Sequence, residues 1–157
     1  MKKFKFTLQT LFDVKQTLKD KLQADFAAAE AAYQAAVDKL TSLVRTYEEE
    51  LDIFEEKSRE GITARELTSA AAYHEDLRER IRRAEIEAAR TLKIANEKRE
   101  ELVTVYKEIK VLEKLYEKQR AEYLKELEKD EAKALDSILS FQQIEDKDDD
   151  EATEVNV

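Results

Sequence analysis

The sequence predicts an all-α protein, a long antiparallel two-helix coiled-coil hairpin with a C-terminal helical overhang and a disordered acidic tail. Three observations predict this class. The 157 residues include no proline and a single glycine, Gly61, whereas a globular domain needs both residue types for many turns. Charged residues make up 41% of the chain, well above the roughly 25% of ordinary domains. Apolar residues recur in steps of three and four, which is the spacing of a coiled-coil seam.

The turn of the hairpin is predicted at residues 61–63. Gly61 can adopt the left-handed conformation that ends many helices. Thr63 and Glu66 have the spacing of a capping box, in which each side chain binds a backbone N–H of the other residue. The predicted elements are therefore a helix over 4–60, a turn over 61–63 and a helix over 64–143, which together make one hairpin over 1–143.

The two predicted helices carry seams that match when the chain is folded at the turn. With Leu43 opposite Ile81 and Ala36 opposite Ala88, the alanine-rich stretches of both helices face each other, which lets the backbones approach closely. The predicted seam of the first helix is Phe4, Leu8, Leu11, Lys15, Leu18, Leu22, Phe26, Ala29, Tyr33, Ala36, Leu40, Leu43, Tyr47, Leu51 and Phe54. That of the second helix is Leu67, Ala70, His74, Leu77, Ile81, Ala84, Ala88, Thr91, Ala95, Lys98, Leu102, Val105, Ile109, Leu112, Tyr116, Gln119 and Tyr123.

The second helix is predicted to extend beyond the first. In this register the first helix ends opposite residue 120, so residues 121–141 have no intramolecular partner although many of them are apolar. An exposed apolar stripe of this kind usually contacts another protein. Residues 145–157 contain seven acids and one lysine, so the segment 144–157 is expected to be a disordered tail.

Charge and composition exclude several classes of function. The net charge of −9 disfavours nucleic acid, whose binding depends on neutralising phosphates. No apolar run approaches the roughly 20 residues of a membrane span, so no direct membrane insertion is expected. With no targeting segment, a cytoplasmic location is expected.

Catalytic and metal chemistry also lack the residues they need. His74 is the single histidine and has no second nitrogen or thiolate ligand at helical spacing. The run from Asp146 to Asp150 differs from a calcium loop, because Glu151 stands where glycine is required and Val157 where a bidentate glutamate is required. An elongated hairpin has no enclosed pocket for a substrate. We therefore expect no enzyme, no cofactor and no metal site.

Three aromatic residues lie off the predicted seam, and their rings are expected to be exposed. Phe6 and Phe12 lie at the open end of the hairpin, and Tyr73 lies near the turn. Exposed aromatics are enriched among interface anchors. Both ends of the hairpin are therefore candidate binding surfaces. The arginines between residues 78 and 90 have glutamates three to five positions away, so they are expected to form ion pairs on the helix surface.

The sequence resembles the FliJ family of flagellar export proteins over most of residues 1–140. The resemblance includes a Gly-Ile pair at the turn, and Ser137 follows Asp136 where the family often has glutamate. The matching segments are Phe4-Lys5-Phe6-Thr7-Leu8-Gln9-Thr10-Leu11, Leu112-Glu113-Lys114-Leu115, Glu122-Tyr123, and Glu131 followed by Leu135-Asp136.

The resemblance implies a non-catalytic cytoplasmic component of the flagellar type III secretion apparatus, located at the inner face of the cell membrane through that apparatus. Such proteins look like the central stalk of rotary ATPases. The implied partners are the hexameric export ATPase, the export-gate membrane protein and export chaperones. Tyr73 and Leu77 match the gate-contact positions of the family, although Arg80 and Ala84 depart from its pattern. The expected ATPase-ring contacts at the open end are Phe6, Phe12, Tyr123, Leu127, Leu135, Asp136 and Ile138.

Two other classes remain open at this point. A generic coiled-coil scaffold would use residues 121–141 for self-association, and a sedimentation measurement would separate it from a monomeric stalk. A prefoldin-like chaperone also has an antiparallel coiled coil, but it needs strand-forming segments, and no alternating β pattern appears in the sequence.

Overall fold

The computed structural model describes residues 3–154 of the chain, and the side chains of residues 3–148. Two helices make up almost all of this part, α1 over Gln9–Glu60 and α2 over Ala64–Glu154, and none of the described residues forms a strand. The two helices pack against each other, which confirms the predicted all-α hairpin. The chain divides into two compact units, each held together by contacts among its own residues. Unit 2 is Val14–Glu108, and unit 1 combines Met1–Asp13 with Ile109–Val157.

The turn of the hairpin has the predicted chemistry. Gly61 has a φ of 103°, in the left-handed region, and its N–H donates a hydrogen bond of 3.0 Å to the carbonyl of Lys57. The N–H of Thr63 donates to Glu66 Oε2 at 2.9 Å, and the N–H of Glu66 donates to Thr63 Oγ1 at 3.2 Å. These reciprocal bonds form the capping box that begins α2.

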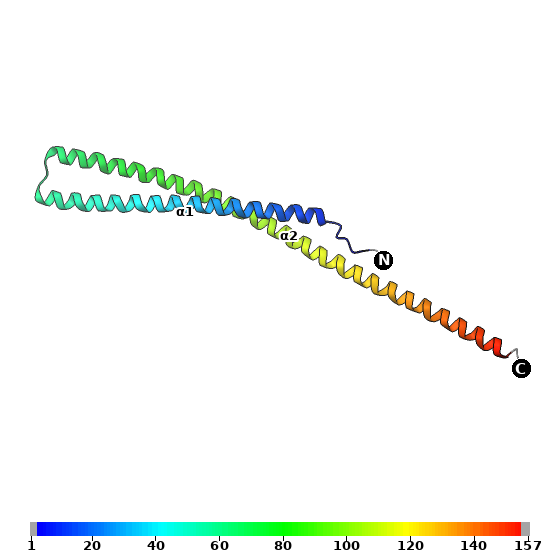
Figure 1. The fold of residues 1–157 in the computed structure, drawn as a ribbon. Helices are drawn as coiled ribbons and strands as arrows, with labels where there is room; N and C mark the ends of the chain where they lie inside the picture. The colour runs from blue at the N-terminus through cyan, green and yellow to red at the C-terminus, as the bar shows by residue number, and fades with distance from the viewer. Residues whose placement is uncertain (1–2, 155–157) are drawn as a thin grey trace. The chain divides into compact units, whose positions relative to one another are not determined.

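In unit 2, α1 and α2 run antiparallel from the turn and lie side by side (Figure 1). The buried positions combine small residues with a few larger ones. Of the buried side chains described in the whole chain, Phe6 alone lies off the predicted seam. The buried residues of unit 2 are Leu22, Ala36, Leu77, Ala84, Ala88, Thr91, Ala95 and Val105, and those of unit 1 are Phe6, Ile109 and Leu112.

Contacts across the seam of unit 2 agree with the predicted register to within about one helical turn. The Lys15 ammonium lies 2.5 Å from Glu108 Oε2, one residue from the position predicted opposite Lys15. His74 lies edge-on between Phe54 and Tyr47, with ring centroids 5.5 and 6.1 Å away. His74 is therefore part of the aromatic packing between the helices, as expected of a histidine on a seam.

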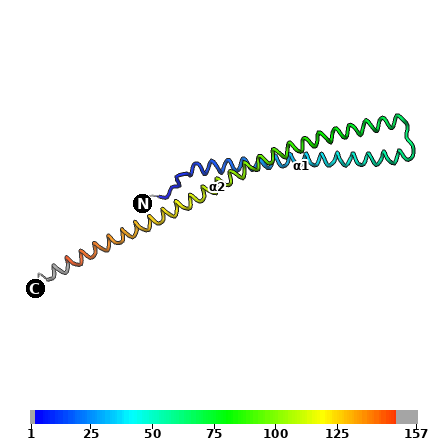
Figure 2. The backbone as a smooth tube through the Cα atoms, turned by 180° about the vertical axis from the view of Figure 1, so that it is seen from behind, coloured from blue at the N-terminus to red at the C-terminus, as the bar shows by residue number. Residues whose placement is uncertain are grey.

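The prediction that the first helix begins at Phe4 is wrong, because α1 begins at Gln9. Residues 3–6 have no regular secondary structure and lie along α2 in unit 1, as the dark-blue segment of Figure 2 shows. In an extended segment, residues two apart project to the same side. Phe4 and Phe6 can therefore both contact Tyr116, which a helix would not allow because it would turn one ring away.

The prediction that the second helix ends near residue 143 is also wrong, because α2 continues to Glu154. The described part of the segment 144–157, expected to be disordered, is thus helical, and residues 155–157 lie outside the described part of the chain. No glycine or proline follows Gly61 to end the helix. Acids near a helix C-terminus are unfavourable to the helix dipole, but they do not prevent a helical backbone. The division into a 1–143 hairpin and a 144–157 tail stays a prediction.

Candidate functional site: protein-binding surfaces

The N-terminal segment packs an aromatic cluster against α2 in unit 1. Phe4 lies 5.5 Å from both Tyr116 and Tyr123, and Phe6 lies 5.4 Å from Tyr116, all as distances between ring centroids. The Phe6 side chain is only 8% exposed, so the prediction that its ring is exposed is wrong. Tyr123 is half-buried beneath Phe4. The contacts among these rings stabilise unit 1.

A polar clamp fixes the same segment. Gln119 Nε2 donates a hydrogen bond of 2.9 Å to Thr7 Oγ1, and the N–H of Thr7 donates to Gln119 Oε1 at 3.4 Å. Beside this clamp Phe6, Phe12 and Tyr116 line an open groove of about 480 Å³. Phe12 is half-buried rather than exposed, and its side chain lines this groove.

Beyond Leu127 the described side chains of α2 are all exposed. Every residue from 128 to 148 is exposed. Leu135 is 58% exposed and Ile138 is 56% exposed, which is unusual for large aliphatic side chains that follow one another on one helix. Tyr123 and Leu127 are half-buried and line a hollow with Lys3, Phe4 and Lys5 of the N-terminal segment, so the uninterrupted run of exposed residues begins at 128, about seven residues later than predicted.

The large aliphatic residues between 124 and 139 share one face of α2, here named the C-terminal stripe, whereas the exposed Ile144 lies on another face. At about 100° per residue they fall within an arc of about 120°. Asp136 lies about 120° from the middle of that arc, so it belongs to another face. The C-terminal stripe consists of Leu124, Leu127, Leu135, Ile138 and Leu139.

The C-terminal stripe does not continue the hairpin seam. When the seam is continued beyond Tyr123 in alternating steps of three and four, it reaches only polar residues as far as Ser140. The stripe begins one position after Tyr123, at Leu124, and so lies about 100° further around the helix. The polar residues on the extended seam are Glu126, Asp130, Lys133, Ser137 and Ser140. The stripe is therefore a separate contact face and not a longer version of the interface with α1.

Near the turn, the structure separates the two residues expected to contact an export gate. Tyr73 is 41% exposed and lines an open groove with Phe54 and Ile62. Leu77 is 2% exposed and lies in the core of unit 2, where the seam pattern places it. Of the pair, only Tyr73 offers its side chain to a partner.

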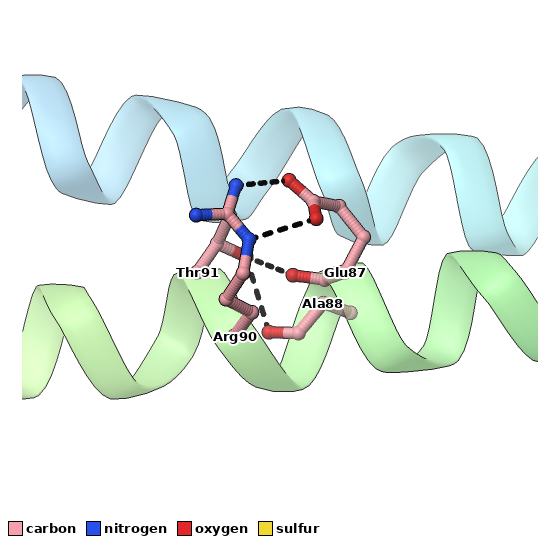
Figure 3. Close-up of polar contacts among 4 residues, drawn as sticks. All are labelled: Glu87, Ala88, Arg90 and Thr91. Atoms are coloured by element: carbon pink, nitrogen blue, oxygen red, sulfur yellow. Dashed lines mark hydrogen bonds and ion pairs between the residues drawn. The ribbon is translucent and has the colours of Figure 1, made fainter.

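The arginines of α2 form ion pairs along the helix, as predicted. Arg78, Arg80 and Arg83 each contact an acid three or four residues before them. Arg90 contacts Glu87 through two nitrogens, at 2.5 and 2.9 Å, as Figure 3 shows. These hydrogen bonds lower the pKa of the Glu87 carboxyl below its ordinary value and raise the pKa of Arg90. The same view shows Thr91, whose buried hydroxyl donates to the carbonyls of Glu87 and Ala88.

Sequence reasoning missed Phe4 and Gln119 as the residues that fix the N-terminal segment. The alternation of Phe4 and Phe6 with lysines was an available signal for an extended segment, because period two is the spacing of extended chain. Gln119, a polar residue on the seam, was a signal for a specific polar partner across it. It finds that partner in Thr7.

Neither a metal-ion cluster nor a candidate membrane span occurs among the described residues. Within residues 3–148 no three His, Asp or Glu side chains converge to hold a metal ion. None of the described helical segments combines the length and hydropathy of a membrane span.

Comparison with known proteins gives one match. The family model described as flagellar FliJ protein matches residues 4–147. No curated protein and no solved structure matches the chain. The match covers both helices, the turn, the N-terminal aromatic segment and the C-terminal stripe. The chain therefore belongs to the FliJ family, whose members are components of flagellar protein export.

Proposed function

We propose that the chain is a non-catalytic, stalk-like subunit of the flagellar export ATPase, which contacts the ATPase ring through unit 1. The observation that carries this proposal is the C-terminal stripe. Large aliphatic side chains on a polar helix lie exposed in a member of an export family, and apolar surface of this kind is characteristic of a protein–protein contact.

The stripe supplies the ring contacts in this proposal. Leu127, Leu135 and Ile138 belong to it, and Asp136 lies at the edge of the opposite face. Phe12 contributes through its groove. Phe6 and Tyr123, by contrast, hold the N-terminal segment on α2, so their substitution would act on the ATPase contact through folding.

A second surface near the turn serves the export gate in this proposal, with Tyr73 as its aromatic anchor. Exposed aliphatic residues also occur near the turn on both helices, namely Leu51, Ile53 and Leu67. Export chaperones are the third class of partner. With these partners the protein acts in the cytoplasm, at the inner face of the membrane through the export apparatus.

The test is binding to, and stimulation of, the cognate export ATPase by a Leu127→Ser and Ile138→Ser double variant. Full burial of one such side chain contributes about 1.5–3 kcal/mol. The double variant is therefore expected to weaken association by about tenfold or more, with an unchanged helical circular dichroism signal. The matched control is a Val103→Ser and Val111→Ser double variant, because both valines are exposed elsewhere on α2. Normal stimulation by the stripe variant, together with loss of stimulation by Tyr73→Ala, would assign the ATPase contact to the surface near the turn instead.

A further inference from the structure

The charges on the exposed part of α2 are not evenly distributed around the helix. Between residues 124 and 148 every charged residue within the arc of the C-terminal stripe is acidic, and the lysines between 125 and 147 all lie at least about 100° from its middle. The far face carries both signs, with acids that include Glu126 and Asp130. The acids within the stripe are Glu128, Glu131, Glu145 and Asp146, and the excluded lysines are Lys125, Lys129, Lys133 and Lys147.

Glu131 lies between Leu127 and Leu135 of the C-terminal stripe and has no cation one helical turn away, as is also true of Glu145 and Asp146 beyond the last residue of the stripe. The neighbours of Glu131 one helical turn away are Leu127, Glu128, Ala134 and Leu135, so no lysine or arginine lies within helical reach. No ion pair or hydrogen bond among the described side chains involves the Glu131 carboxylate. Elsewhere on α2 the acids of the arginine-rich stretch do find helical partners. The chain therefore leaves one carboxylate uncompensated in the middle of an aliphatic face.

A partner that covers this face also removes water from Glu131. Burying a carboxylate without a counter-charge is strongly unfavourable, so a purely aliphatic partner surface would lose much of what it gains from Leu127, Leu135 and Ile138. A guanidinium or ammonium group opposite Glu131 removes this penalty and adds a charge-assisted hydrogen bond. From this we propose that the C-terminal stripe docks on a protein surface in which an arginine or lysine, set inside an apolar groove, pairs with Glu131.

A second copy of this chain does not meet that requirement. With stripe against stripe, in either direction, the facing charged residues of both copies are acids and the lysines of both copies point away. Like charges juxtaposed in an interface are destabilising. An anionic membrane surface is disfavoured for the same reason.

This inference rests on the proposed function, because it takes the export ATPase as the partner that carries the cation. The test therefore titrates the cognate export ATPase with full-length variants of the chain. Glu131→Lys is expected to weaken binding by about tenfold or more, and Glu131→Gln by a smaller factor. The matched control is Glu126→Lys, which makes the same charge change five residues away on the far face and is expected to stay within about twofold of the wild type. Binding of the wild type should weaken with added salt, and Glu131→Gln should show a smaller salt dependence.

The outcomes distinguish this inference from the proposed function. If the Leu127→Ser and Ile138→Ser variant loses affinity while Glu131→Lys binds like Glu126→Lys, the ATPase contact stands and the cationic partner residue is refuted. If the wild-type chain does not bind the ATPase, both proposals fail. A wild-type dimer in sedimentation that the Leu127→Ser and Ile138→Ser variant abolishes would show that a second copy covers the stripe, which overturns the inference.

Discussion

The ring of Phe6 lies edge-on against Tyr116, with centroids 5.4 Å apart and planes at 84°. Tyr116 also packs against Phe4, two residues earlier in the same extended segment. One tyrosine of α2 thus binds both rings of a segment that belongs to no helix. Edge-to-face pairs of this kind add about 0.5–1.5 kcal/mol to the burial of the rings.

We predict that Phe6→Ala releases the N-terminal segment without unfolding the helices. The variant loses one buried ring and one aromatic pair, so the segment should open more often, while the core of unit 2 is untouched. Amide hydrogen exchange at Thr7 and Gln9, whose N–H groups are bonded in the closed segment, should speed up by about tenfold or more. Val14→Ala, at an exposed position nearby, should leave this exchange unchanged. Equal exchange rates in Phe6→Ala and the wild type would show that the aromatic pair does not hold the segment.

The sequence predicted the interface between the helices well, because steps of three and four translate directly into one helix face. Leu77, Ala88 and Thr91 are buried where the heptad pattern places them, although Thr91 is polar. The turn was equally predictable. Gly61 and the Thr63–Glu66 box act through local backbone geometry, and nothing elsewhere in the chain needs to be known.

The two surfaces were less predictable, because exposure depends on what covers a residue and not only on its helical face. The seam pattern predicted an exposed Phe6 only because it assumed that the first helix begins at Phe4. Leu77 matched a gate-contact position of the family, yet its place on the seam had already assigned it to the core. The change of face at Leu124 was visible in the sequence. Its significance depends on knowing that the N-terminal segment stops covering α2 near Leu127.

We predict that Leu77→Ala lowers the free energy of unfolding by about 2–3 kcal/mol, because the removed side chain is fully buried and leaves a cavity. Urea unfolding followed by circular dichroism measures the change. The control is Ile86→Ala on the same helix, where the isoleucine is 65% exposed and the expected loss is below about 0.5 kcal/mol. A Leu77→Ala variant as stable as the wild type but unable to bind the export gate would place this side chain on the surface in solution.

We predict that Arg90→Gln raises the pKa of Glu87 towards its ordinary value. The hydrogen bond from Arg90 is the main cause of the lowered pKa, and the charges of Arg90 and Lys39 act in the same direction. Because the folded-state pKa lies below the unfolded one, the pair stabilises the fold above the ordinary pKa of glutamate, about 4.3, and this contribution is lost as the pH falls through the lower folded value. A carbon-detected NMR titration of the Glu87 carboxyl measures the shift. The Lys39→Gln variant should shift the Glu87 pKa less, and a larger effect of Lys39→Gln would reverse the assignment of the cause.

We predict that ending the chain after Gln143 removes helix but not stability. The described side chains of the removed segment, those of residues 144–148, are all exposed, so we expect the unfolding midpoint to stay within about 2 °C. The total helical signal per molecule should nevertheless fall, because α2 continues to Glu154. Added salt should strengthen the helical signal of the full chain more than that of the truncated one, since it screens repulsion among the acids and between them and the helix C-terminus. An unchanged helical signal after truncation would show that the tail is disordered, as its composition predicted. A large fall in the unfolding midpoint would show that the acidic end of α2 packs against the rest of the protein.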